Sequence, residues 1–335
     1  MPPQNADKAS PDDTNIEPAR VFSGRVAALA GGVGAARMLR GLVRATDPAK
    51  LTTIVNTGDD REFYGVYVAP DLDIVTYTLA GAVDPGKGFG LAGDTFSLME
   101  ELGTLGHETW FRLGDRDFAH CLHRTLRMRA GDGLAQLSES LRRTHGLSCS
   151  ILPMSEDPAP TLVELNDGRR IHFEEYLVRE KSPANVRAVH LDAARAATPA
   201  PGVLAAIATA EIVIICPSNP VVSIGPILAV PGIREAIANS GAPVVAISPI
   251  IGGAPVKGPA DHLLRAIGCE VSALGVAGLY RDLAQGFVFD RVDAAQLADI
   301  EELGMRAVST QTLMTDLDIS TQLAATALEL ALSLR

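Results

Sequence analysis

The chain has 335 residues, of which 47% are hydrophobic and 21% charged, proportions that are ordinary for a globular protein. Its formal net charge is −11, which argues against a nucleic-acid partner, because affinity for nucleic acid depends on Lys and Arg that neutralise phosphates. Four widely spaced cysteines without a CxxC pair argue against zinc or a disulfide framework, and no run of 18 apolar residues could cross a membrane.

The chain begins with residues 1–23, which carry Pro, Asp and Asn where a signal peptide would have a basic start and an apolar core. This composition predicts a disordered tail and a cytoplasmic protein. Residues 24–335 are then long enough for a single large α/β domain.

Two apolar strands are predicted next, each ending in a polar or glycine-rich loop. Arg25–Ala30 runs into the glycines of residues 31–34, and a helix over Ala35–Val43 follows. Thr52–Asn56 is a second β-branched run, which stops at Thr57-Gly58-Asp59-Asp60. The spacing predicts strand, loop, helix and strand in succession.

The same alternation returns in the second half of the chain. The expected strands are Glu211–Cys216, Pro243–Ser248, Val271–Val276, Gly286–Phe289 and Arg306–Ser309, and the expected helices lie near Pro231–Asn239, Ala260–Ile267 and Asp316–Leu334. Continuous apolar strands that alternate with helices indicate a parallel sheet covered on both faces. In such sheets ligands bind at the carboxyl ends of the strands, where the strand order reverses.

The middle of the chain has a different pattern. Ser150–Pro153, Thr161–Leu165 and Arg170–Tyr176 are short strand-like segments, and Asn166-Asp167-Gly168 is a good hairpin turn. Residues 130–190 are therefore predicted to form a helical and β-hairpin cap insertion beside the ligand cleft.

The first glycine loop does not fit the common nucleotide motifs. Arg37 stands where a dinucleotide fingerprint has its third glycine, and Lys87 lacks the spacing of a phosphate-binding P-loop. Gly32 and Gly34 still let the backbone approach an anion at a helix start. A tight turn without a ligand is the alternative.

Acidic residues give the sharper signal. Asp59 and Asp60 end the second strand, and Asp71 and Asp73 open the next helix, where Asp71 could instead be a cap. Carboxylates from neighbouring strand ends repel one another unless a cation lies between them. Oxygen ligands select magnesium or calcium rather than zinc, so the pattern predicts a metal site.

The loop over residues 217–226 combines stiffening prolines with Ser218, Asn219 and Ser223. These side chains could bind a nucleotide or phosphate through hydrogen bonds, whereas an isolated loop of this composition could equally be an ordinary turn. The seven histidines include no ligand pair such as HExxH.

Taken together, these segments resemble the 2-phospho-L-lactate transferases of coenzyme F-420 biosynthesis over about residues 25–330. The matching stretches include GGVGAARML (31–39), IVNTGDD (54–60), APDLDIVTYTLAG (69–81), RLGDRD (112–117), PSNPVVSIGPIL (217–228) and SPIIGGAPVKGPAD (248–261). Ala35 departs from the family, in which glycine or threonine is commoner at this position.

The resemblance implies a three-layer Rossmann-like fold with a cap, a homodimer, and a magnesium-dependent transfer. In that reaction the phosphate of a small phosphorylated acid, carried as a guanosine diphosphate diester, is joined to the ribityl hydroxyl of the deazaflavin Fo, and GMP is released. Asp73 and Arg112 would contact Fo, and Asp59 and Asp73 would be the catalytic carboxylates that hold Mg²⁺. The guanylyl donor would be bound by Gly32, Gly34, Ser218, Asn219 and Ser223.

Two other functions stay open from the residues alone. One is a nucleotide-sugar or NAD-dependent enzyme, against which the missing third glycine argues. The other is a non-catalytic nucleotide-binding regulator, which the PDLD and RLGDRD segments make less favoured. The resemblance also leaves open whether lactate, enolpyruvate or glycerate is the acid, since these differ by a few atoms in one pocket.

Overall fold

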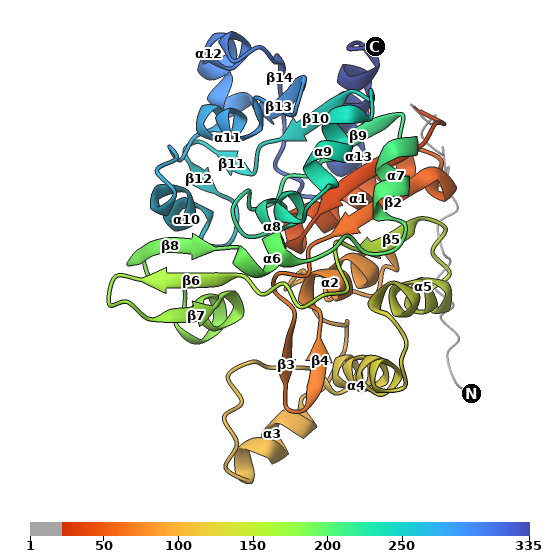
Figure 1. Ribbon diagram of the computed structural model, residues 1–335, viewed down its shortest axis with the longest axis vertical. Coiled ribbons are helices and arrows are strands. Elements are labelled where there is room, and N and C mark those ends of the chain that lie inside the picture. The colour runs from red at the N-terminus through yellow and green to blue at the C-terminus, as the bar shows by residue number, and fades with distance from the viewer. Residues whose placement is uncertain (1–21) are drawn as a thin grey trace, which may run out of the picture.

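A computed structural model describes residues 22–335. Residues 1–21 of the expected disordered tail, which was predicted over residues 1–23, therefore lie outside the described residues. Seven strands form one sheet at the centre of the chain, and every neighbouring pair is parallel (Figure 1). Across the sheet the order is β14 (Arg306–Thr310), β13 (Gly286–Asp290), β10 (Val244–Ile247), β9 (Ile212–Ile215), β1 (Val26–Ala30), β2 (Leu51–Val55) and β5 (Ser150–Pro153).

The strand order reverses beside β1, which lies between β2 and β9. Chain order runs from β1 through β2 to β5 on one side, and from β9 through β10 and β13 to β14 on the other. A crevice at the carboxyl ends of β1 and β9 is thus the expected ligand position in this topology. The predicted α/β parallel sheet is confirmed.

Helices cover both faces of the sheet, because successive apolar side chains of each strand point to opposite faces. Val26, Ala28 and Ala30 of β1 belong to one buried core, and Ala27 and Leu29 to the other. The first core includes α1 (Gly32–Ala45), α2 (Pro70–Leu79), α5 (Leu134–Thr144) and α13 (Leu317–Leu332). The second includes α6 (Asp192–Ala196), α7 (Val203–Thr209), α8 (Ile224–Ala229), α9 (Ile233–Asn239), α10 (Ala260–Ala266), α11 (Ala273–Tyr280) and α12 (Leu297–Glu302).

One group of elements projects from the sheet at the foot of Figure 1. It consists of the hairpin β3 (Arg61–Phe63) and β4 (Val66–Val68), followed by α3 (Ser97–Thr104) and α4 (Asp115–Arg129). A small core of its own, which includes Phe63, Met99 and Cys121, holds this group together.

A second group forms a three-stranded antiparallel sheet beside the main one. Its strands are β6 (Leu162–Leu165), β7 (Arg170–His172) and β8 (Val186–His190), in the order β7-β6-β8, and a π-helical turn spans Glu175–Arg179. The predicted hairpin turn at residues 166–168 is confirmed. Residues 130–190 are thus shared between this sheet and the main domain, because Ser150–Pro153 is the edge strand β5.

Four local expectations differ from the structure. The strand expected over Arg170–Tyr176 ends at His172, and a π-helical turn begins at Glu175. Val271–Val276 is not a strand, because α11 begins at Ala273, where the Ser272 side chain accepts a hydrogen bond from Gly275 N at 2.9 Å. A short apolar run does not distinguish a strand from a buried helix. Gly32 and Gly34 lie in the first turn of α1 rather than before it, and the proline-rich loop contains the unpredicted helix α8.

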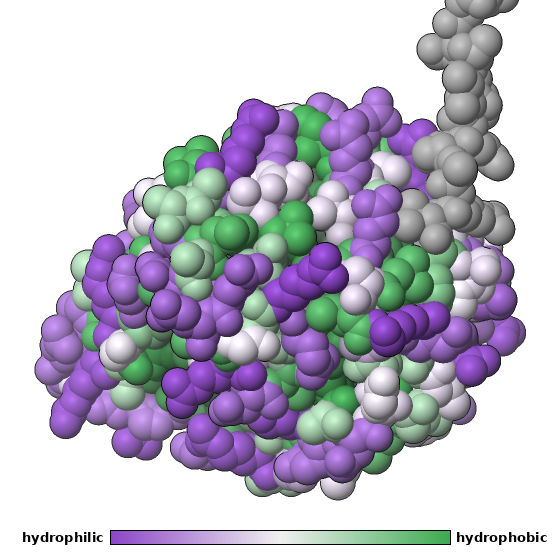
Figure 2. Space-filling model, turned by 90° about the horizontal axis from the view of Figure 1, so that it is seen from above, coloured by the Kyte–Doolittle hydropathy of each residue, from purple (hydrophilic) through white to green (hydrophobic). Residues whose placement is uncertain are grey.

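The remaining elements are short. They are the hairpin β11 (Ile250–Ile251) and β12 (Ala254–Pro255), and 3₁₀ turns over Pro48–Lys50 and Arg291–Gln296. The face seen in Figure 2 intersperses hydrophilic and hydrophobic residues. Among residues 22–335, no helix combines the length and apolar composition needed to span a bilayer.

Candidate active site

Three loops meet at the point where the strand order reverses. They follow β1, β2 and β9, and Gly31 lies where they join. A Cβ added to Gly31 would lie 2.7 Å from Asp71 Oδ2, 2.9 Å from Ser223 Cβ and 3.3 Å from Asn56 Cβ. Only a residue without a side chain lets these loops approach so closely.

Asp71 and Asn56 connect the loops through hydrogen bonds. Gly32 N donates to Asp71 Oδ1 at 2.7 Å, and Asn56 Nδ2 donates to Asp71 Oδ2 at 2.9 Å. Asn56 Nδ2 also lies 3.3 Å from Val222 O, and its Oδ1 accepts from Gly58 N at 2.8 Å. Asp71 therefore caps α1 rather than its own helix α2, and its carboxylate meets the helix start where an anion was expected.

Asp59 and Glu174 add two more buried carboxyl groups beside Asp71. Burial, followed by the charges of Asp71 and Glu174, raises the pKa of Asp59 well above its usual range. Burial and then Asp71 raise the pKa of Glu174 to about 8. Burial raises the pKa of Asp71 to about 6, although its hydrogen bonds from Asn56 and Gly32 oppose this. The three groups form an electrostatically coupled acidic cluster.

Asp73 has a different partner. Its Oδ1 accepts a hydrogen bond from Arg124 Nη2 of α4, and both side chains are 7% exposed. Asp117 lies on the other side of this pair, since ligand atoms of Asp73, Asp117 and Cys121 lie within 4.8 Å of one another. The predicted pair of Asp59 and Asp73 is thus divided between two environments.

Arg112, the other predicted acceptor contact, is exposed in the loop before α4, with its guanidinium 4.9 Å from the centroid of the Phe96 ring. Acidic residues near Arg112 hold this loop in place through hydrogen bonds to backbone N–H groups. Asp115 accepts from Ser97 N at 3.1 Å and Leu98 N at 2.9 Å, and so caps α3.

Two polar side chains of the predicted donor-binding loop already have hydrogen-bond partners, in the loop itself and at Gly31. The Ser218 hydroxyl donates to Gly31 O, and Asn219 Oδ1 accepts from Val221 N at 3.0 Å and Val222 N at 3.3 Å. Ser223 is buried at the start of α8. A Cβ on Gly34 would lie only 2.5 Å from Pro217 O, so this loop packs directly against the start of α1.

Several buried polar atoms beside the acidic cluster have no hydrogen-bond partner among residues 22–335. They are Asp59 Oδ1, Thr57 Oγ1, Thr161 Oγ1 and His172 Nε2. Buried polar atoms are normally paired, so unpaired ones point to a ligand or ion. Burial lowers the pKa of His172 to about 4, which makes its imidazole neutral. Carboxylate and hydroxyl oxygens in this number fit Mg²⁺ or Ca²⁺.

Arg37 of α1 and Lys257 lie close together beside the loop that carries Lys87, whose own ammonium forms an ion pair with Asp84 at 3.5 Å. Lys257 Nζ donates to Lys87 O at 2.9 Å and lies 4.9 Å from the centroid of the Phe89 ring. A Cβ added to Gly88 would lie 3.9 Å from Arg37 Nη2, so the loop that carries Lys87 reaches Arg37. Burial, and then the charge of Arg37, lower the pKa of Lys257. This arrangement can attract a multiply charged anion.

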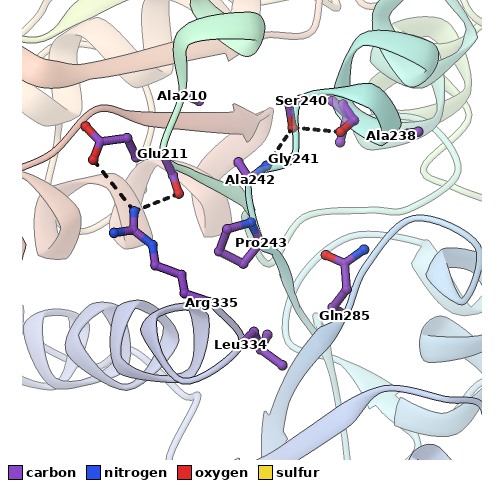
Figure 3. Close-up of a pocket in the computed structure, with 11 residues that line it drawn as sticks. Ala210, Glu211, Ala238, Ser240, Gly241, Ala242, Pro243, Gln285, Leu334 and Arg335 are labelled. Atoms are coloured by element: carbon purple, nitrogen blue, oxygen red, sulfur yellow. Dashed lines mark hydrogen bonds and ion pairs between the residues drawn. The ribbon is translucent and has the colours of Figure 1, made fainter.

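A cavity of about 580 Å³ lies at the opposite, amino-terminal edge of the sheet (Figure 3). Its lining includes Glu211, Pro243 and Gln285, which immediately precede β9, β10 and β13, and Arg335 forms an ion pair with Glu211 at 3.8 Å. It contains none of the predicted site residues. Since parallel sheets bind ligands at their carboxyl edge, we assign the site to the loops around Gly31 at that edge.

Sequence reasoning missed three residues of this site. Asn56 follows β2 directly, immediately before the acidic loop, so the rule that singled out Asp59 could have found it. Glu174 follows the buried end of β7, and a buried acid after a strand is a comparable signal. No sequence signal marks Arg124, because its partner Asp73 is 51 residues away.

Comparisons with known proteins identify the family. The family described as 2-phospho-L-lactate transferase CofD matches residues 26–321. A phosphoenolpyruvate transferase of Streptomyces avermitilis is 48% identical over 316 residues, which are 93% of this chain and 99% of that protein. A 2-phospho-L-lactate transferase of Methanosarcina mazei is 40% identical over 294 residues, covering 88% and 96%.

Solved structures show the same fold at much lower identity. A Bacillus halodurans protein described as a member of the UPF0052 family superimposes with a TM-score of 0.60 at 18% identity, over 91% of this chain and 99% of that one. This similarity supports the α/β fold, while the family match and the relatives above decide the family. The chain therefore belongs to the CofD family of 2-phospho-L-lactate transferases.

Proposed function

We propose that the protein joins the phosphate of a small phosphorylated acid, activated as a guanosine diphosphate diester, to the ribityl hydroxyl of the deazaflavin Fo. GMP is released, and the product belongs to coenzyme F-420 biosynthesis. The observation that carries this proposal is the acidic cluster of Asp59, Asp71 and Glu174, at the strand-order reversal of a chain that matches the family over residues 26–321. We place the enzyme in the cytoplasm as a homodimer, as the family resemblance implies.

Mg²⁺ is the proposed cofactor, and Asp59 and Asp71 are its proposed ligands. Asp59 Oδ1 is buried without a partner in the described part of the chain, and the Asp71 carboxylate accepts a hydrogen bond from Asn56. Asp73 is a less suitable ligand than the sequence indicated, because Arg124 already neutralises it. A divalent ion held there supplies charge neutralisation to phosphate oxygens.

The donor brings several negative charges, and Arg37, Lys87 and Lys257 are the groups that we expect to meet them. Free N–H groups in the first turn of α1 add to this attraction. The relatives named phosphoenolpyruvate transferase reach 48% identity, against 40% for those named 2-phospho-L-lactate transferase. We therefore propose that the transferred acid is enolpyruvate.

The acceptor is proposed to meet Asp73 and Arg112, as the family resemblance implies. Displacement at phosphorus depends mainly on the alignment of the two substrates and on neutralising charge, rather than on a covalent protein intermediate. The chain's contribution is then to hold the acceptor hydroxyl next to the donor and to exclude water from the site.

A direct assay tests the proposal. Full-length protein is incubated with Fo and with each of the lactyl, enolpyruvyl and glyceryl donors, in Mg²⁺ or in EDTA, and GMP and coupled product are measured by mass spectrometry. We expect equal amounts of GMP and product from the enolpyruvyl donor in Mg²⁺ only. Absence of product from all three donors with folded protein overturns the proposed reaction, and unchanged turnover in EDTA overturns the proposed cofactor.

A further inference from the structure

The strongest unexplained contact in the site is the ion pair between Asp73 and Arg124. Asp73 lies in the first turn of α2, and Arg124 lies on α4, which belongs to the projecting group of elements. The side chains are each 7% exposed. Buried ion pairs contribute little to stability compared with apolar packing, because both charges lose their hydration. A role in the site is a better explanation for this one.

Arg124 is itself held in place from several sides. Its Nη1 donates to Tyr67 O at 3.3 Å, and Tyr67 OH donates to Asp60 Oδ2 at 2.9 Å. The guanidinium therefore connects Asp73 to the hairpin that follows β2 and to the loop that carries Asp59 and Asp60. With an exposure of 6%, Arg124 has little surface left for a substrate.

We propose that Arg124 is a positioning residue for the acceptor: it fixes the Asp73 carboxylate in the single orientation that receives a hydrogen bond from the deazaflavin. The inference rests on the proposed function, in which Asp73 meets the acceptor. A planar guanidinium suits this task, because its N–H groups have fixed directions: with Nη1 held by Tyr67 O, Nη2 can donate to Asp73 in one direction only, whereas an ammonium rotates.

A metal site at the same place fits the contacts less well. Asp73, Asp117 and Cys121 bring their ligand atoms within 4.8 Å of one another. Arg124 Nη1, however, lies 3.9 Å from Cys121 Sγ and Nη2 is bonded to Asp73, so a positive charge already contacts two of the three residues. A metal ion there would be repelled by the guanidinium.

Arg124→Met and Arg124→Lys test the proposal by equilibrium binding and steady-state kinetics. Deazaflavin binding is followed by its fluorescence without donor, and KM is then measured for each substrate. We expect Arg124→Met to weaken deazaflavin binding about tenfold or more, with the donor KM changed less than about twofold, and Arg124→Lys to recover part of the loss. Arg129→Met is the matched control, because Arg129 lies on the same helix and is exposed.

A double-mutant cycle decides whether Arg124 acts through Asp73. In an Asp73→Asn background, Arg124→Met should weaken deazaflavin binding by less than about twofold further. Equal losses for both substrates, or losses that multiply in the double variant, would overturn the inference in favour of a general structural role. If Arg124→Met does not fold, the same double-mutant cycle is measured with Arg124→Lys in its place. Wild-type protein that binds no deazaflavin would instead overturn the proposed function.

Discussion

At the scale of single residues, the acidic cluster makes Glu174 a group that carries a proton near neutrality. Its pKa is raised to about 8, so most of the side chain is neutral at about pH 6 and ionised at about pH 9. Glutamine has the same shape as the protonated acid. Without metal, Glu174→Gln should therefore leave the free energy of unfolding almost unchanged only at about pH 4, where the unfolded chain also carries the proton, and should increase it at about pH 9.

Urea denaturation in EDTA at the two pH values measures this difference. Glu100→Gln is the control, because Glu100 is an exposed residue of α3, and it should shift neither value. An effect of Glu174→Gln that is the same at both pH values would show that the pKa of the wild-type side chain is not raised in the folded protein.

Lys257 gives a second prediction at this scale, which mirrors the one for Arg124. Lys257→Met removes one of the cations that we expect to meet the donor. We expect the donor KM to rise about fivefold or more while the acceptor KM stays within about twofold. Lys50→Met is the matched control, because Lys50 precedes β2 at the opposite edge of the sheet. A rise in the acceptor KM alone would place the donor elsewhere.

At the scale of elements, the packing of α1 against α13 depends on Gly41. A Cβ at this position would collide with the backbone of Ser320, which cannot move as a side-chain end can. We expect Gly41→Ala to reduce the free energy of unfolding by about 2 kcal/mol or more. Gly278→Ala in α11 is the control, since its Cβ would meet no described atom within 4 Å, and it should stabilise by about 1 kcal/mol. Thermal or urea unfolding of both variants measures the contrast.

The elements also show where sequence reasoning succeeds and where it stops. β1, β2, β9, β10 and β13 are almost wholly buried, and such continuous apolar runs can be recognised locally. Residues 271–276 have the same composition, but a cap at Ser272 makes them helical, and periodicity does not separate these outcomes over so few residues. The sequence places the edge strand β5 in the insertion, because local sequence does not show its pairing with β2, which connects residues about one hundred positions apart.

The same limit applies to the site. Strand ends identified Asp59 and the loop at Ser218, because the carboxyl edge of a parallel sheet follows from the strands alone. The different partners of the two acids could not be predicted. Asp71 accepts a hydrogen bond at the start of α1 and Asp73 pairs with Arg124, although the two acids are only two residues apart on α2. That choice depends on tertiary partners that no local pattern specifies.

For the whole molecule, the buried acids make stability depend on pH and on magnesium together. The pKa values of Asp71, Asp117 and Glu174 are raised to about 6, 7 and 8, so the native state binds more protons than the unfolded chain between roughly pH 4 and these values. The stability contributed by these groups is complete below that window and is lost as the pH rises through it. In EDTA, the free energy of unfolding should therefore fall from about pH 5 to about pH 8.

Mg²⁺ should reverse this loss, because it competes with protons for the same carboxylates and binds only the folded site. We expect millimolar Mg²⁺ to raise Tm by several degrees at about pH 8 and by little at about pH 5. Asp59→Asn should abolish the response, whereas Asp318→Asn, an exposed acid of α13, should keep it. A Tm that does not respond to Mg²⁺ at the higher pH, in protein whose stability still falls with pH, would show that the cluster is a proton-binding site without a cation. In that case the charge neutralisation for phosphoryl transfer would have to come from Arg37, Lys87 and Lys257 alone.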